Sequence, residues 1–304
     1  MLFDALAFVT QGFIGIVADK YKKFNYDLLG CIVISLSLLL PFDILSLIMI
    51  CIGNALVHIG GAQLTLKTSG GKITPTSIFV GGGSFGVITG QLLGMLNEKA
   101  LLIIPLVLMV ISIFIIIITK NRYFIKNRKW NMDITSNHSA TLIMLIAFLV
   151  VAIRAYIGYA IPTEWNKTQI QAILLFAIMG IGKISGGILA DTIGYYKTIL
   201  ISSFLSLPFL LFGNSIMILS LVGVGLFSMT MPITIAVLVS KFPQRQCFAF
   251  GITTVALFVG TFPAFFIRPT TLLSHQITVF LLIFIATVAL LFCIEKRTKN
   301  EYEL

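Results

Sequence analysis

Gly15-Ile16-Val17-Ala18-Asp19-Lys20-Tyr21-Lys22-Lys23 closes a long apolar run and returns, 172 positions later (187 minus 15), as Gly187-Ile188-Leu189-Ala190-Asp191-Thr192-Ile193-Gly194-Tyr195-Tyr196-Lys197. In both copies the apolar run ends with a small residue, an Asp and a basic turn. Two copies at this spacing predict a chain built from two related halves inside a membrane.

The composition predicts that lipid surrounds the chain. It is 58% hydrophobic and 11% charged, whereas an average soluble domain is about 45–50% apolar and about 25% charged. A formal net charge of +10 could indicate a nucleic-acid partner. The basic residues, however, lie between apolar runs and not on one polar face, so membrane topology explains them better. We therefore expect a lipid bilayer and no nucleic acid as partner.

The sequence shows no signs of enzyme chemistry. It holds no Gly-rich phosphate loop, no HExxH pattern, no carboxylate pair at helical spacing and no nucleophile motif with a base. Cys31, Cys51, Cys247 and Cys293 are isolated, without CxxC spacing or His neighbours, and we interpret them as packing residues. No enzymatic activity, cofactor or metal is expected.

Runs of about 20 apolar residues are needed to cross the hydrocarbon core as a helix. The sequence predicts eleven such spans: Leu2–Ala18, Leu28–Phe42, Ile44–Leu66, Pro75–Leu96, Ala100–Thr119, Thr141–Ile161, Thr168–Ala190, Thr198–Gly213, Ser215–Ser240, Gln246–Ile267 and Ile277–Ile294. The predicted fold class is therefore an all-α membrane protein. We expect a five-span bundle over 1–119, a basic linker over 120–140, a six-span bundle over 141–294 and a tail over 295–304.

Basic residues predict the orientation, since cytoplasmic loops are enriched in Lys and Arg. If the first span ends in the cytoplasm, three basic residues face outside (Lys99, Lys167 and Arg268) and sixteen face inside: Lys20, Lys22, Lys23, Lys67, Lys72, Lys120, Arg122, Lys126, Arg128, Lys129, Lys197, Lys241, Arg245, Lys296, Arg297 and Lys299. We expect an exterior N-terminus and a cytoplasmic C-terminus in a bacterial plasma membrane.

The chain resembles the major facilitator superfamily, whose members are secondary transporters with two six-helix halves joined by a basic cytoplasmic loop. The resemblance rests on the family's signature loop and its echo in the second half: Gly15, Ala18, Asp19, Lys20, Lys22 and Lys23, then Gly187, Ala190, Asp191, Gly194 and Lys197. It implies two pseudo-symmetric bundles that move a small-molecule substrate by alternating access, driven by a proton or another coupling ion. We expect a monomer.

The resemblance also implies a departure, because the family's first helix has no counterpart here. A misassigned start codon, a degraded fragment and a true eleven-span protein all remain open. A second hypothesis is therefore a truncated or non-transporting relative, sensor-like or receptor-like, with the same fold. In the family the cavity is lined by the helices that correspond to Ile44–Leu66, Thr141–Ile161 and Ser215–Ser240.

Asp19 and Asp191 each lie at a helix C-terminus, where the helix dipole disfavours a carboxylate by about 0.3–1 kcal/mol. Pseudo-symmetry predicts that Asp19 faces the start of Gln246–Ile267, with its free N–H groups and Arg245, while Asp191 faces the start of Pro75–Leu96 near Lys72. Such contacts would gate the cytoplasmic side. We assign Asp19, Lys20, Asp191, Arg245 and Lys183 to coupling or gating. The alternative is that both Asp side chains lie in a solvated basic loop.

Ionisable groups inside spans are costly, which favours a functional interpretation. Arg154, with Tyr156 and Tyr159 close by, could bind an anionic or carboxylate-bearing solute. The alternative is a structural Arg that is paired with a carbonyl group or reaches water. Lys183 occupies the place of Gln11 in the first copy (183 minus 172) and could equally extend toward the interface.

His58 lies in a predicted cavity helix, with Asn54 one turn before it. A neutral imidazole could carry a coupling proton, although a His hydrogen-bonded within a helix interface is the alternative. No acidic residue lies clearly at the midplane, and Asp4 is the nearest candidate. Our candidate substrate site consists of His58, Asn54, Arg154, Tyr156 and Tyr159.

Gly82, Gly86, Gly90 and Gly94 recur at a strict four-residue interval within Pro75–Leu96. The interval predicts a groove along one helix face where another helix packs closely. Antiporters of the superfamily carry a glycine-rich motif on the corresponding helix, although their Gly-Pro pair is missing here. This slightly favours export over uptake.

Overall fold

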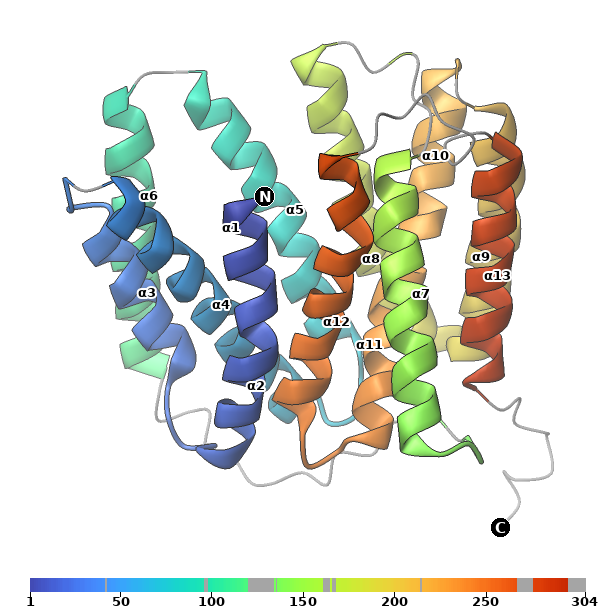
Figure 1. Cartoon of the computed structure of the whole chain (residues 1–304), viewed down its shortest axis with the longest axis horizontal. Coiled ribbons are helices and arrows are strands. Elements are labelled where there is room, and N and C mark those ends of the chain that lie inside the picture. Colours follow the sequence, from blue (N-terminus) through green and yellow to red (C-terminus); the bar gives the residue numbers. More distant parts are fainter. Residues whose placement is uncertain are drawn as a thin grey trace.

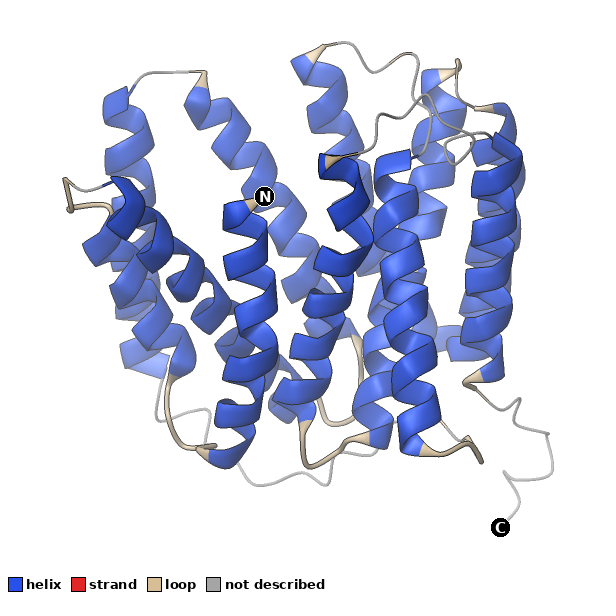
Figure 2. Cartoon of the chain, in the orientation of Figure 1, coloured by secondary structure: helices blue, strands red, loops and turns tan. Residues whose placement is uncertain are grey.

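The computed structural model describes residues 1–41, 43–95, 98–119, 134, 136–160, 165, 168–213, 215–266 and 276–294. Within these ranges the chain forms helices and no strand (Figure 2). Most of the linker expected over 120–140 and the tail from residue 295 fall outside the described residues.

In chain order, the described helices are α1 Leu2–Asp4, the π-helical η1 Ala5–Val9, α2 Thr10–Lys20, α3 Tyr26–Ser37, α4 Asp43–Thr68, α5 Thr74–Gly94, α6 Glu98–Thr119, α7 Ala140–Ala160, α8 Gln169–Ile193, α9 Tyr195–Phe212, α10 Met217–Ser228, α11 Thr230–Lys241, α12 Gln246–Thr261, the 3₁₀ turn η3 Phe262–Phe265, and α13 Gln276–Phe292.

Among the described residues, eight helical segments are long and apolar enough to cross a membrane. Three shorter apolar helices, Tyr26–Ser37, Leu102–Ile118 and Gln276–Phe292, complete the set. The eleven predicted spans are thus confirmed, and the chain is an integral membrane protein. Large side chains such as Phe13, Ile44 and Phe114 remain exposed on the outer surface, as expected where lipid is the solvent.

The helices form two bundles, with α1–α6 on the left of Figure 1 and α7–α13 on the right. The loops that join α2 to α3, α4 to α5 and α11 to α12 lie at one end of the molecule, together with the end of α13 (Figure 1). We call this end the basic end, because these loops carry Lys22, Lys23, Lys72 and Arg245. It is the end that the charge distribution predicts to be cytoplasmic.

One predicted span is broken. The expected helix Ser215–Ser240 divides at Met229 into α10 and α11. Pro232 causes the division, since it has no N–H to donate to the Ser228 carbonyl and its ring crowds that group. Side chains bond the carbonyl of Phe227, next to the break: the Thr230 hydroxyl donates to it at 3.2 Å.

Glycine is required at one turn of the duplicated stretch. Gly194, between α8 and α9, has a φ of 94°, which L side chains rarely adopt. The first copy has Tyr21 after its helix, with a φ of −105°. The two turns therefore differ in backbone conformation, although the helices before them match.

Two helix pairs join the bundles, α2 with α12 and α5 with α8, and their contacts obey the internal symmetry. A Cβ on Gly12 would lie 3.0 Å from Val255, and a Cβ on Gly81 would lie 2.6 Å from Ile184. Ile184 is the counterpart of Gly12 in the first repeat (12 plus 172), so each contact joins one glycine to one branched side chain. These closely packed pairs carry the candidate site.

Candidate functional site

Asp19 joins α2 to α12 at the basic end. Its Oδ1 accepts the backbone N–H of Cys247 at 3.0 Å, and its Oδ2 accepts that of Phe248 at 2.8 Å. Both donors belong to the first turn of α12, whose N–H groups have no partner within the helix. The positive end of the α12 dipole thus offsets the unfavourable position of Asp19 at the end of α2.

Asp191 makes the equivalent contact between α8 and α5. It accepts the backbone N–H of Ile73 at 3.0 Å and that of Thr74 at 2.8 Å, and the Thr74 hydroxyl donates to it at 2.6 Å. The contact that pseudo-symmetry predicts is therefore present in both copies. Each carboxylate joins the end of a helix in one half to the start of a helix in the other.

Among the described residues, the cations expected near these carboxylates form no ion pair with them. These cations, Arg245 and Lys72, are exposed. Each carboxylate instead accepts hydrogen bonds from two backbone N–H groups. Lys20 is also exposed and places its ammonium 5.3 Å from the centre of the Tyr21 ring.

Side chains from α4 hold the turn after α2 in place. Gln63 donates to the Ala18 carbonyl at 3.3 Å, and Lys67 donates to the Lys22 carbonyl at 3.1 Å. Lys22 in turn lies 3.5 Å from Gln244 in the loop between α11 and α12. The α2–α3 turn thus contacts both halves at the basic end.

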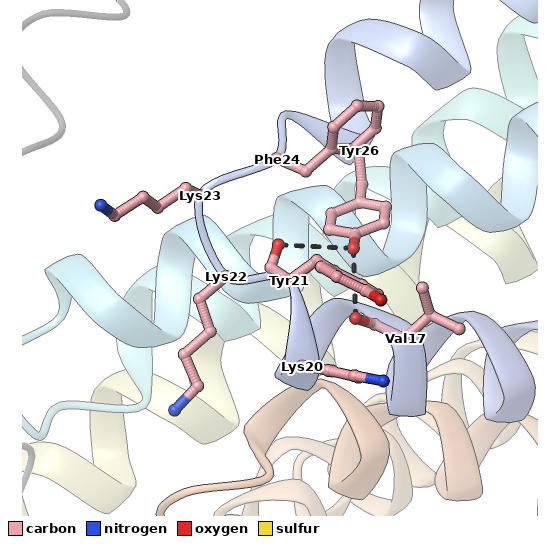
Figure 3. A pocket seen from close by; sticks show the side chains of 7 residues that line it. All are labelled: Val17, Lys20, Tyr21, Lys22, Lys23, Phe24 and Tyr26. Carbon is pink, nitrogen blue, oxygen red and sulfur yellow. Dashed lines mark hydrogen bonds between the residues drawn. The ribbon is translucent and has the colours of Figure 1, made fainter.

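An open pocket of about 800 Å³ lies against this turn, lined by Val17, Lys20, Tyr21, Lys22, Lys23, Phe24 and Tyr26 (Figure 3). The Tyr26 hydroxyl lies within hydrogen-bond distance of two carbonyl groups, that of Val17 at 3.2 Å and that of Tyr21 at 3.4 Å. The pocket belongs to the surface of the basic end. It contains none of the residues that the sequence assigned to substrate.

Arg154 projects from α7 to the broken helix. Its Nη2 donates to the Phe227 carbonyl at 2.6 Å, and its guanidinium lies 4.6 Å from the centre of the Phe227 ring. Arg154 stands fourteen residues, about 21 Å, from the start of α7 (154 minus 140). The side chain is half-buried, and a cation at this depth costs about 2.5–3.5 kcal/mol on insertion scales.

Lys183 on α8 forms a hydrogen bond between the two halves. Its ammonium donates to the Ser84 hydroxyl of α5 at 2.9 Å. Lys183 therefore contacts the other half and does not extend toward the membrane interface. Gln11, its counterpart in α2, is fully buried and donates to the Ala7 carbonyl at 2.8 Å.

The remaining candidates for substrate binding are spread over two helices. His58 and Asn54 are half-buried on α4, and the His58 ring meets Phe79 edge-on at 5.8 Å. Tyr156 lies on α7 against an apolar cluster that includes Ile157 and Phe227. The side chain of Tyr159 is outside the described part. Asp4 pairs with the N-terminal ammonium at 3.4 Å, away from these groups.

The glycine stripe does not pack, which corrects the prediction for Gly82, Gly86, Gly90 and Gly94. A Cβ on any of the four would meet no described atom within 4 Å. The packed face of α5 is instead Ser77, Gly81 and Ser84, which are all buried. The stripe begins one residue later, and thus lies about 100° further around the helix.

The glycine stripe of α5 can be compared with the equivalent face of α12 in the second half. Ile73 and Thr74 correspond to Cys247 and Phe248, so Gly86 corresponds to Gly260 (86 plus 174). Gly260 packs against the Ala152 backbone of α7. No described helix occupies the equivalent place on α5.

Sequence reasoning missed Thr74, Ser84 and Phe227. The sequence did contain a signal for Ser84. The Asp191 contact joins the end of α8 to the start of α5, so the two helices lie antiparallel from that point. Lys183 lies eight residues along α8 from that contact (191 minus 183) and Ser84 ten along α5 (84 minus 74), which are similar depths. Nothing in the sequence marked the Phe227 carbonyl.

A scan against protein-family models finds no match, and neither does a search of curated protein sequences. Solved structures do match. A variant of the E. coli fucose:proton symporter FucP is 13% identical, with a TM-score of 0.64 over 97% of this chain and 89% of that chain. FucP in the outward conformation, a major facilitator superfamily transporter, gives a TM-score of 0.61 at 14% identity, over 97% and 90%. The chain therefore has the major facilitator fold of two pseudo-symmetric bundles.

Proposed function

We propose that the chain is a secondary active transporter that moves small solutes by alternating access between the bundles 1–119 and 141–294. The observation that carries the proposal is the duplicated contact of Asp19 and Asp191. Each carboxylate joins helices of opposite halves at the same end of the membrane. A fold built for static packing would not need the same reversible polar contact twice.

In this mechanism the two Asp contacts close the basic end while a midplane site faces the opposite side. Separation of the halves exchanges four carboxylate–backbone bonds for bonds to water, so the closed and open forms can differ little in free energy. The similarity to a transporter in the outward conformation supports this assignment of the closed end.

The orientation and the driving force are part of the same proposal. We place the basic end in the cytoplasm of a bacterial plasma membrane, with the N-terminus outside, because of the sixteen basic residues expected there. A proton or ion gradient drives transport by a monomer. The glycine-rich α5 favours export, and the similarity to a fucose:proton symporter supports proton coupling.

A flux measurement tests the proposal. Proteoliposomes with the full chain are given a pH gradient and screened for gradient-dependent movement of labelled solutes. We expect flux that a protonophore abolishes and that the double variant Asp19→Asn/Asp191→Asn lacks. Asp27→Asn is the matched control, because Asp27 accepts the Leu28 N–H of its own helix at 2.9 Å.

The competing function is that of a non-transporting relative with the same fold. Solute binding to the folded protein without gradient-dependent flux of any bound solute would contradict transport and support that alternative. Flux that is equal in the double variant and in wild type would contradict the role given to the two carboxylates.

A further inference from the structure

Two basic side chains enter the membrane interior without a counter-ion. Arg154 bonds a carbonyl and Lys183 bonds a hydroxyl, and in the described ranges no carboxylate lies within ion-pair distance of either. The sequence places no acidic residue in α7, and α8 has none before Asp191 at its basic end. Natural proteins rarely keep buried cations unless a partner, permanent or transient, compensates them.

The packing of α8 directs Lys183 toward the space between the halves. Gly180 and Gly187 face α5, where their Cβ positions meet Ser84 and Ser77, while Gly182 and Gly186 face Ser228 and Met229. With about 100° per residue, Lys183 falls between these two packed faces. Its stem therefore points neither into α5 nor into the broken helix, but between them.

Arg154 approaches the same place from α7. The Phe227 carbonyl that it bonds directly precedes Ser228, against which Gly182 packs. Lys183 lies close enough to both Arg154 and His58 for electrostatic interaction. Three groups that can carry positive charge thus converge from α4, α7 and α8.

We propose that Arg154 and Lys183 together bind a small organic anion with a carboxylate group, which is the solute of the proposed transporter and supplies the missing negative charge. That this anion is a transported solute rests on the proposed function. The donors are available, since a guanidinium has five N–H donors and an ammonium three, while Arg154 and Lys183 each donate one hydrogen bond within the described part of the chain. The planar guanidinium fits a carboxylate, and the ammonium adds a second charge-assisted bond.

The position of Lys183 connects binding to movement. Its bond to Ser84 joins α8 to α5, and hence one half to the other. A bound anion competes with Ser84 for the ammonium, so occupancy weakens this cross-half contact. Solute binding and rearrangement of the halves then share one side chain.

The test uses the purified full chain in detergent and follows thermal unfolding with matched probes. The probes are succinate, lactate and gluconate, each compared with its neutral amide. Lys183→Gln and Arg154→Gln remove one charge each, and the former introduces the residue that the first repeat has at position 11. Lys197→Gln removes an exposed charge at the basic end and is the control.

We expect the melting temperature of wild type and of Lys197→Gln to rise with at least one carboxylate and with no amide. In the two site variants, binding weakens by about tenfold to a hundredfold. Without any probe, both site variants melt no lower than wild type, because each relieves repulsion between unpaired cations. A purely structural pair would instead lose stability in both.

Three results would overturn the proposal: no carboxylate response in wild type, a response that both site variants retain, or a loss of stability in both variants without probe. Binding of a neutral solute that neither substitution affects would overturn the anionic class alone. Gradient-dependent flux of that solute would leave the transport proposal intact.

Discussion

Asp19 and Asp191 make the same contact with the same geometry, each accepting two successive backbone N–H groups at 3.0 and 2.8 Å. The donors start helices of the opposite half in both cases. Because a helix start offers free N–H groups and positive potential, a carboxylate is the side chain that binds there best. The duplication of the sequence is therefore also a duplication of the contact between halves.

Substitution of a single Asp should loosen only the helix that it contacts. Asp19→Asn loses the charge and one of two acceptor oxygens, so amide exchange at Cys247 and Phe248 should accelerate about tenfold. Exchange at Ile73 and Thr74 should change little, since Asp191 remains. Hydrogen exchange with mass spectrometry measures both segments, and equal acceleration at the two sites would count against independent contacts. Asp27→Asn serves as the control.

The nearby cations should matter much less. Arg245→Gln and Lys72→Gln remove exposed charges that form no described ion pair with Asp19 or Asp191, so exchange at both helix starts should stay within about twofold of wild type. A tenfold increase in Arg245→Gln would show that charge pairing, and not the backbone N–H groups, holds Asp19.

Two glycine substitutions should have opposite effects. A Cβ on Gly15 would lie 2.5 Å from the Cys247 carbonyl oxygen, whereas a Cβ on Gly86 meets nothing within 4 Å. Gly15→Ala should therefore separate α2 from α12 and lower the melting temperature. Gly86→Ala should keep or raise it, because Ala favours helix over Gly by about 1 kcal/mol. A loss of stability in Gly86→Ala would place a packing partner on the stripe.

The Tyr26 hydroxyl should stabilise the turn at the basic end. Tyr26→Phe removes the donor to the Val17 and Tyr21 carbonyls while it keeps the ring, and should reduce the free energy of unfolding by about 0.5–1.5 kcal/mol. Phe24→Leu, at an exposed position of the same pocket, should have a smaller effect. Denaturation in mixed micelles compares the two variants, and the reverse order would contradict this role.

The sequence was sufficient to predict the spans and the Asp contacts, because both follow from a repeated pattern and from the needs of a carboxylate at a helix end. The partners of Arg154 and Lys183 could not be predicted in the same way. The Phe227 carbonyl and the Ser84 hydroxyl lie on helices distant in the sequence, and they reach Arg154 and Lys183 only through the packing of the helices.

The glycine stripe shows a different limit. A four-residue interval identifies a face, but it does not say whether a helix lies against that face. Gly260 meets α7 and Gly86 meets no described atom, although symmetry relates the two positions. The residues that do pack on α8 are Ser77, Gly81 and Ser84, whose mixed composition hid the pattern.

The most direct test of alternating access is a pair of distances measured by double electron–electron resonance. Spin labels at Lys23→Cys and Gln244→Cys report on the basic end, and labels at Leu39→Cys and Ile216→Cys report on the opposite end, in a background without the four native cysteines. In the Asp19→Asn/Asp191→Asn variant the basic-end distance should lengthen while the opposite-end distance shortens, relative to wild type. If both distances keep their wild-type distributions, or lengthen together, the two carboxylates do not control alternating access.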